Sequence, residues 1–553
     1  MTGLSEHLDS TITWSGTIRN APISIRSYSS LHVRRVVCRH NPGTVTKAMP
    51  LSRLIAAILA LTLTSGAALA QDAAARFAQY RSSPPLLRAF LYLMPKGGDL
   101  HNHLTGAAYA EATIRAAAAA GMCFNPDTSK AIHPPCTPPT RPIADALHDA
   151  LLNRTLVDAW SMRDFVPVSG LSGRDHFFAA FTKFGGAAPM GDLAADVVDR
   201  AGRQRMRYVE LMATFQGGAV GALADKVAST HSLTGDPTEF EAALRAAGIE
   251  GLVPHASSDI DVLEQRMRHI LGCGTPAAKP GCDVTVRWLQ QVSRVMSPQR
   301  VFASSLFGAL LAKGEPRVVG LDFVAPEDDP NALANYTQQM HMLDYLYTKM
   351  PETNISLHAG ELTLGLVRPE DLLFHIRQAV ELGHAKRIGH GVDVMYEEQP
   401  FELLRAMAAK RVAVEINLTS NAAILGVQGA AHPFPVYLSA GVPVVLSTDD
   451  EGIERIDRTN ELQRAVTTYG LDWRALIGLE RNTLEYAFVA GGSLWANPRT
   501  WQKVPECAGT VVTRKLPPRC AAFLHRSDKA RLQWDFEREL VNFDKEARLL
   551  RIR

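Results

Sequence analysis

The sequence predicts an α/β fold, a TIM-type (β/α)8 barrel with a disulfide-bracketed insertion after its first strand. Short apolar, β-branched runs alternate along the chain with helix-like segments, the pattern of parallel βαβ units. Eight such runs are enough to close a barrel, and 553 residues can bury a core of that size. A doubly wound open sheet is the alternative.

The eight expected strands follow in chain order, with helices such as 369–383 and 399–410 between them. The strands are residues 98–104, 207–213, 284–293, 318–325, 354–360, 387–391, 412–420 and 442–450. Two insertions, about 108–172 and about 254–283, interrupt the alternation, and each contains a pair of cysteines. We expect loops or a small subdomain there, with disulfides in place of a hydrophobic core.

The start of the chain carries the pattern of an export signal. Residues 49–70 combine Arg53, the apolar run 54–61 and a small-x-small site at 68–70, as in a cleaved signal peptide. The apolar run is too short to cross a bilayer. Residues 1–48 are expected to be a disordered upstream extension, with an Arg- and Ser-rich transit peptide as the alternative.

The remaining chain is expected to form one barrel with two flanking segments. An N-terminal helical segment spans 71–93, the barrel spans 94–500, and a C-terminal segment spans 501–553. Residues 531–550 in that last segment read as an amphipathic helix that packs on the barrel, or alternatively serves a homodimer.

Composition and cysteine usage indicate an exported globular protein. Hydrophobic residues make up 46% and charged residues 21% of the chain, and the formal net charge is +2. Since no basic region stands out, we expect no nucleic-acid partner, and no membrane attachment once the signal is cleaved. We therefore predict a secreted or periplasmic protein.

Six cysteines follow the signal and form three couples that are close in sequence: Cys123 and Cys136, Cys273 and Cys282, Cys507 and Cys520. An even number in an exported chain indicates disulfides. Six cysteines allow 15 connectivities, and the short loops favour the three sequential pairs. A structural zinc site would need CxxC-type spacing, which the sequence does not contain.

Polar residues stand at the ends of several predicted strands, where the mouth of a parallel barrel forms an active site. They are His101, His103, His358, His390 and Asp449. Three histidines with one carboxylate suit Zn²⁺, which lowers the pKa of a water molecule to about 7 in catalytic sites. The nearby Glu361, His390 and Asp450 could supply an acid, a base and an anchor for hydrolysis of an aromatic C–N bond.

Four motifs in this order resemble the adenosine deaminase family of the amidohydrolase superfamily: "MPKGGDLHNHLTGA", "SLHAGE", "RIGHG" and "LSTDDEG". The resemblance covers most of residues 94–490. The insertion after the first strand and the export signal resemble the secreted, growth-factor-related branch of that family.

The resemblance implies a role for each of these residues. It implies one zinc ion per chain, with His101, His103, His358 and Asp449 as its ligands. Glu361 would protonate the purine nitrogen N1, and His390 would orient or deprotonate the zinc-bound water that attacks C6. Asp450 would hold N7.

Two positions depart from the family pattern. Thr105 stands where ordinary members have an Asp that contacts the ribose, and a threonine can hydrogen-bond there only as a neutral group. Ala325 replaces a Gly whose backbone N–H meets the purine, so the N–H is kept while the methyl group crowds the approach. Both departures concern substrate recognition.

The resulting prediction is a hydrolase whose small-molecule partner is a purine nucleoside. It would convert adenosine or 2′-deoxyadenosine and water to inosine or deoxyinosine and ammonia. One alternative is another mononuclear amidohydrolase reaction on an N6-substituted or free purine. The end of the fourth predicted strand, "LDFVAPE", lacks the bridging Lys of binuclear relatives, which favours a single metal ion. Another is a non-enzymatic, growth-factor-like binding protein, which would have no use for Glu361.

Overall fold

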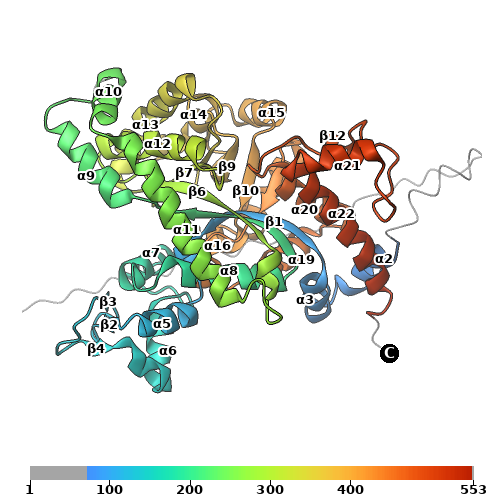
Figure 1. Cartoon of the computed structure of the whole chain (residues 1–553), viewed down its shortest axis with the longest axis horizontal. Coiled ribbons are helices and arrows are strands. Elements are labelled where there is room, and N and C mark those ends of the chain that lie inside the picture. Colours follow the sequence, from blue (N-terminus) through green and yellow to red (C-terminus); the bar gives the residue numbers. More distant parts are fainter. Residues whose placement is uncertain (1–70, 234, 551–553) are drawn as a thin grey trace, which may run out of the picture. The chain divides into compact units, whose positions relative to one another are not determined.

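Eight parallel strands form one sheet in the computed structural model, which describes residues 71–233 and 235–550. In sheet order they are β1 (Lys96–His103), β5 (Met206–Ala213), β6 (Thr285–Ser293), β7 (Val318–Val324), β8 (Ile355–Ala359), β9 (Arg387–His390), β10 (Ala413–Ile416) and β11 (Val444–Leu446). The N–H of His103 donates to the carbonyl of Asp449, and the N–H of Asp449 donates to the carbonyl of His101. These two bonds join the ends of the sheet, and the predicted barrel is confirmed (Figure 1).

Helices surround this sheet in the order expected of βα units (Figure 1). The barrel helices are α7 (Gly173–Phe184), α8 (Met190–Arg203), α9 (Gly217–Ala228), α10 (Thr238–Ala246), α11 (Leu252–Leu271), α12 (Pro298–Gly314), α13 (Pro330–Lys349), α14 (His375–Glu381), α15 (Pro400–Lys410), α16 (Leu418–Leu425), α17 (Phe434–Ser439), α19 (Arg458–Tyr469) and α20 (Trp473–Glu485). Two short helices lie at the ends of the first and last strands: α4 (Leu104–Ala107) follows β1 directly, and residues 447–450 separate α18 (Glu451–Glu454) from β11.

The expected strand at 412–420 is wrong in its second half. The strand β10 ends at Ile416, and helix α16 begins at Leu418. The buried carboxylate of Glu461 accepts hydrogen bonds from the N–H groups of Leu418 and Thr419. A carboxylate at this place accepts from N–H groups that the first turn of a helix leaves unpaired. Glu461, which is distant in sequence, therefore stabilises the start of α16.

The second insertion, about 254–283, was expected to form loops or a small subdomain, and it is instead mostly helix: α11 fills most of it and packs against α8. Its buried residues recur every three or four positions: Ala256, Ile260, Leu263, Met267 and Leu271. This spacing is the period of a helix, so the sequence did carry the signal. The disulfide Cys273–Cys282 follows the helix.

The first insertion forms a small subdomain beside the barrel. It contains α5 (Ala110–Ala119), a sheet of β2 (Cys123–Phe124), β3 (Ala131–Ile132) and β4 (Arg141–Pro142), and α6 (Ala150–Ala159). Contrary to expectation it has a hydrophobic cluster of its own, which includes Ile114, Phe124 and Trp160. Phe177 of α7 belongs to the same cluster, and this contact links the subdomain to the barrel.

All three predicted disulfides are confirmed: Cys123–Cys136, Cys273–Cys282 and Cys507–Cys520. The first lies within the subdomain of the insertion. The third lies in the C-terminal segment, which holds β12 (Trp495–Asn497), β13 (Gln502–Lys503), α21 (Pro518–His525) and α22 (Asp528–Ala547).

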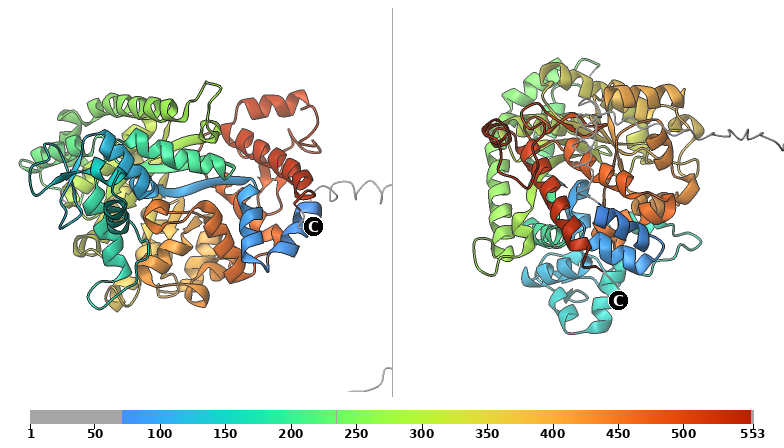
Figure 2. Two further views of the ribbon diagram at one scale, coloured as in Figure 1. Left: turned by 90° about the horizontal axis from the view of Figure 1, so that it is seen from below. Right: turned by 90° about the vertical axis from the view of Figure 1, so that its right-hand side faces the viewer.

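The C-terminal helix packs on the barrel, as the sequence predicts, and lies on the side away from the insertion (Figures 1 and 2). Leu532 and Phe536 of α22 join Leu100 and Tyr208 in one buried cluster. The helices α2 (Gln71–Tyr80) and α3 (Pro84–Leu93) pack against the same end of the chain.

The predicted extension and signal, residues 1–70, lie outside the described residues. Within residues 71–233 and 235–550, none of the helices has the length and apolar character needed to cross a bilayer.

Candidate active site

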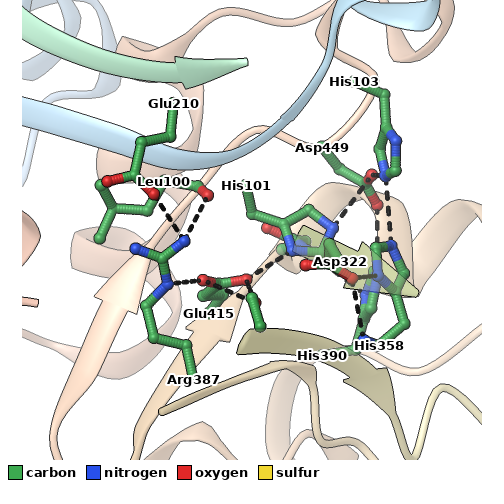
Figure 3. Close-up of polar contacts among 12 residues, drawn as sticks. Leu100, His101, His103, Glu210, Asp322, His358, Arg387, His390, Glu415 and Asp449 are labelled. Atoms are coloured by element: carbon green, nitrogen blue, oxygen red, sulfur yellow. Dashed lines mark hydrogen bonds and ion pairs between the residues drawn. The ribbon is translucent and has the colours of Figure 1, made fainter. Parts of the chain in front are cut away.

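The four predicted metal ligands meet at the mouth of the barrel (Figure 3). His101, His103 and His358 belong to the ends of β1 and β8, and Asp449 follows β11. One ligand atom from each lies within 4.8 Å of the others, and all four residues are buried. Nε2 of His103 lies 3.2 Å from Nε2 of His358, and Oδ1 of Asp449 lies 3.4 Å from Nε2 of His103.

Three further polar residues orient the histidines from behind. Glu415 contacts Nδ1 of His101 at 2.7 Å, Asp322 contacts Nδ1 of His358 at 2.7 Å, and the amide of Gln291 contacts Nδ1 of His103 at 2.8 Å. The carboxylates of Glu415 and Asp322 accept from Nδ1 of His101 and His358 and so leave each Nε2 free toward the centre of the cluster, which is typical of metal-binding histidines.

The donor set fits a zinc ion. Nε2 of His101 is fully buried and has no hydrogen-bond partner among the described residues, although it faces the cluster. A buried ring nitrogen without a partner is unfavourable unless a ligand occupies its lone pair. Three imidazole nitrogens and one carboxylate oxygen are donors that Zn²⁺ prefers.

The sequence prediction missed Asp322, Glu415 and Gln291. Asp322 stands in "VVGLDFV" and Glu415 in "VAVEI", two strands that are otherwise apolar. A charged residue inside such a strand is a signal that a buried partner exists. The sequence does not say which partner, because the pairs are 36 and 314 residues apart.

Glu361 follows β8, and its carboxyl group is buried beside the cluster. Its Oε1 lies 3.4 Å from Nδ1 of His390, and Nε2 of His390 lies 3.7 Å from Oδ2 of Asp449. Burial, and then the negative charges of Asp449 and Glu327, raise the pKa of Glu361 well above its usual value. A carboxyl group in such surroundings retains its proton and can act as an acid.

A second carboxylate, Glu327, holds the backbone of this loop in place. It accepts hydrogen bonds from the N–H groups of Gly360 and Glu361 at 3.1 and 2.9 Å. Although burial alone would raise its pKa, the contacts with His375 and Arg294 hold the pKa of Glu327 at about 2. The ionised Glu327 thus holds in place the loop that carries the protonated Glu361.

Asp450 stands next to the ligand Asp449 and faces the same cavity. A side chain at Gly106 would place its Cβ 1.7 Å from Oδ1 of Asp450, so only glycine fits there. Burial and the charge of Asp449 raise the pKa of Asp450 well above its usual value.

A cavity of about 420 Å³ opens in front of the cluster. Eight of the nine predicted site residues line it, and His101 lies buried behind them. Its lining consists of His103, Thr105, Phe177, Phe178, Phe181, Thr182, Gln291, Val324, Ala325, Pro326, His358, Glu361, His390, Ile424, Asp449 and Asp450. The three phenylalanine side chains all come from α7, and their part in the site was not predicted.

Part of the chain is similar to one family of known proteins. Residues 252–493 match the family described as adenosine deaminase. An adenosine deaminase of Vibrio atlanticus is 26% identical over 201 residues, 35% of this chain and 55% of that relative. One of Salmonella heidelberg is 35% identical over 140 residues, 25% of this chain and 39% of that relative. The chain therefore spans about half, or less, of the length of these curated relatives.

The solved structures that are similar to the chain include two deaminases. The N6-methyl-AMP deaminase of Arabidopsis thaliana has 20% sequence identity and a TM-score of 0.47, with 73% of this chain and 94% of the other covered. An adenine deaminase of Arthrobacter aurescens has 18% identity and a TM-score of 0.42, with 72% and 94% covered.

The matched stretch supplies six of the eight barrel strands and most of the residues at the mouth. His101 and His103 lie before it, on β1, and the fold brings them to the same cluster. Over residues 252–493 the chain is thus similar to the adenosine deaminase family, and the fold adds His101 and His103 to the same cluster.

Proposed function

We propose that the protein is a zinc-dependent hydrolase that removes the amino group at C6 of adenosine or 2′-deoxyadenosine. The observation that carries this proposal is the pairing of a buried three-histidine, one-aspartate cluster with Glu361, a carboxyl group of raised pKa beside it. A binding protein would gain nothing from a buried acid in that position, whereas hydrolysis at a purine C–N bond needs one.

The residues divide the work between them. When bound by His101, His103, His358 and Asp449, one zinc ion would supply a nucleophile by lowering the pKa of a water molecule. Glu361 would donate its proton to N1 as attack at C6 places charge on that nitrogen. His390 would orient or deprotonate the attacking oxygen.

Recognition of the substrate falls to the other residues of the cavity. The buried Asp450 would hold N7 of the purine, and the N–H of Ala325 would meet the ring. Thr105 is exposed at the cavity and would offer the ribose a neutral hydroxyl group.

The cavity lining favours a nucleoside over a nucleotide. Among the described residues that line it, none is Lys or Arg. Sites that hold phosphate groups usually use such cations or the N–H groups at the start of a helix. We therefore expect adenosine to be a much better substrate than AMP.

A spectrophotometric panel tests the proposal. The purified zinc-loaded protein is mixed with adenosine, 2′-deoxyadenosine, adenine, N6-methyladenosine and AMP, and the loss of the adenine absorbance band is followed. We expect the first two to be converted fastest. Preference for adenine or N6-methyladenosine would instead support another mononuclear reaction, and no conversion of any compound would support the binding protein.

We also propose that the protein is exported. The three disulfides support this, because such bonds persist mainly outside the reducing cytosol. N-terminal sequencing of the protein from the extracellular or periplasmic fraction should give a start near Gln71. A start at Met1 or Met49 in that fraction would reject cleavage of the signal.

A further inference from the structure

We propose that Asn421 and His432 are positioning residues that hold His390 as the neutral tautomer with its proton on Nε2. The structural part of this inference stands on hydrogen bonds among the chain's own side chains. Its catalytic consequence rests on the proposed function.

The three side chains form a continuous buried chain of hydrogen bonds. Nδ2 of Asn421 lies 2.9 Å from Nδ1 of His390, and Oδ1 of Asn421 lies 3.0 Å from Nε2 of His432. At the far end, the backbone N–H of Phe434 donates to Nδ1 of His432 at 3.1 Å. Asn421 is 0% and His432 2% exposed.

A backbone N–H can only donate, and this fixes the direction of every bond in the chain. Nδ1 of His432 must accept from Phe434, so this imidazole carries its proton on Nε2. That proton is donated to Oδ1 of Asn421, and the amide group then donates from Nδ2 to Nδ1 of His390. Burial lowers the pKa of His432 to about 4, which agrees with a neutral ring.

The opposite direction of these hydrogen bonds, with Asn421 accepting from His390, is excluded because the Phe434 N–H is already a donor to His432. If the amide of Asn421 were turned over, Nε2 of His432 would have to accept a hydrogen bond from it. His432 would then accept at both nitrogens, which a neutral imidazole cannot do. The side-chain amide of Asn417, whose Nδ2 lies 3.4 Å from Nδ1 of His390, adds a second donor on the same nitrogen.

The consequence falls on the other ring nitrogen of His390. Nε2 faces Asp449 at 3.7 Å and has no hydrogen-bond partner among the described residues. Because Nδ1 is an acceptor, Nε2 carries the proton and is a donor toward the mouth of the barrel. In the resting protein His390 can therefore orient an attacking oxygen as a donor, but it cannot take a proton from it at Nε2.

Neutron diffraction on the unmodified, zinc-loaded protein tests the tautomer without any substrate. We expect deuterium on Nε2 of both His390 and His432 and none on either Nδ1. Deuterium on Nδ1 of His390 would overturn the proposal. Since no turnover is involved, this result is independent of whether the protein deaminates adenosine.

Variants test the catalytic part. Asn421→Asp keeps the size but places an acceptor beside Nδ1, which favours the opposite tautomer. We expect kcat for adenosine to fall about 10- to 100-fold, the usual effect of losing such a supporting contact, with KM and zinc content little changed. Asn354→Asp, which changes an amide bonded to the carbonyl of Val319 outside the site, is the control and should keep the wild-type kcat.

His432 provides an independent pair in case Asn421→Asp does not fold. His432→Gln keeps a donor near Asn421 and should retain most of the activity, whereas His432→Leu removes it and should lower kcat like Asn421→Asp. Equal kcat values for these two variants would contradict the proposal.

A double variant shows whether Asn421 acts through His390. Asn421→Asp added to His390→Ala should lower kcat no further than His390→Ala alone, because the group that Asn421 positions is already absent. A further loss of similar size in the double variant would assign Asn421 another role. If the wild-type protein deaminates no adenine compound, the proposed function fails, while the neutron result still decides the tautomer.

Discussion

Three residues at the mouth of the barrel adopt a left-handed backbone conformation although none is glycine. Ala325, His390 and Asp449 have φ angles of +79°, +67° and +56°. For an L-residue this conformation costs about 1–2 kcal/mol, and such residues concentrate at functional sites. At His390 and Asp449 the strained backbone directs a polar side chain to the cluster. At Ala325 the side chain is a methyl group, so the strain places no polar group there.

Ala325→Gly should therefore stabilise the protein. Removing the methyl group relieves the left-handed strain, while the unfolded chain gains some freedom, so we expect the free energy of unfolding to rise by about 0.5–1 kcal/mol. Urea denaturation measures this change. Ala406→Gly, within helix α15, is the control and should lower it by roughly 1 kcal/mol. If Ala325→Gly lowers the free energy of unfolding as much as Ala406→Gly does, the backbone at Ala325 is not strained.

At the scale of elements, helix α7 couples the insertion to the cavity. Phe177, Phe178 and Phe181 line the cavity, and Phe177 also belongs to the hydrophobic cluster of the insertion. Loosening of the insertion is thus expected to reach the phenylalanine side chains that line the cavity, and with them the bound substrate.

The disulfide Cys123–Cys136 tests this coupling. Replacing both cysteines with serine removes a cross-link across 13 residues, worth about 3 kcal/mol in a chain-entropy estimate. We expect faster hydrogen exchange in residues 108–172 and a higher KM for adenosine, with unchanged zinc content. The matched control removes Cys273–Cys282, which lies beyond α11, and should leave KM unchanged. If KM rises only when Cys273–Cys282 is removed, the first insertion is not the one that is coupled to the cavity.

The elements differ in how far the sequence predicts them. Strand β1 and the histidines at its end were predictable because a strand has a period of two and parallel strands end at one mouth. Helix α11 was predictable in principle from its spaced apolar residues. The start of α16 was not, because it depends on Glu461, more than 40 residues away. Asn421 and His432 likewise gained their meaning only from contacts made in the fold.

The molecule as a whole is organised around a barrel whose interior is partly charged. Beside the cluster of His101, His103, His358 and Asp449, the guanidinium of Arg387 contacts the carboxylates of Glu210 and Glu415, and all three side chains are 0% exposed (Figure 3). Glu415 also contacts Nδ1 of His101. The ion pairs that join β5, β9 and β10 thus extend to one of the predicted metal ligands.

Arg387→Met should affect stability and metal binding together. It leaves two carboxylates buried without their cation, and breaking a buried pair in this way costs roughly 3–5 kcal/mol. Glu415 would then hold His101 less firmly, so zinc affinity should also fall. Chemical denaturation and titration with a chelator measure the two effects. Arg300→Met, which breaks the exposed pair with Asp225, should change neither. Wild-type stability of Arg387→Met would contradict this view of the interior.

The most direct test of the account is the turnover of Glu361→Gln, measured together with its zinc content. Glutamine keeps the size of the side chain but is a far poorer proton donor, so the help given to N1 in the transition state is lost. We predict a fall in kcat for adenosine of about 100-fold or more, with one zinc ion per chain retained and KM only modestly changed. Glu370→Gln, an exposed control, should behave like the wild type. A Glu361→Gln variant that holds zinc and deaminates adenosine at the wild-type rate would contradict the proposed role of Glu361.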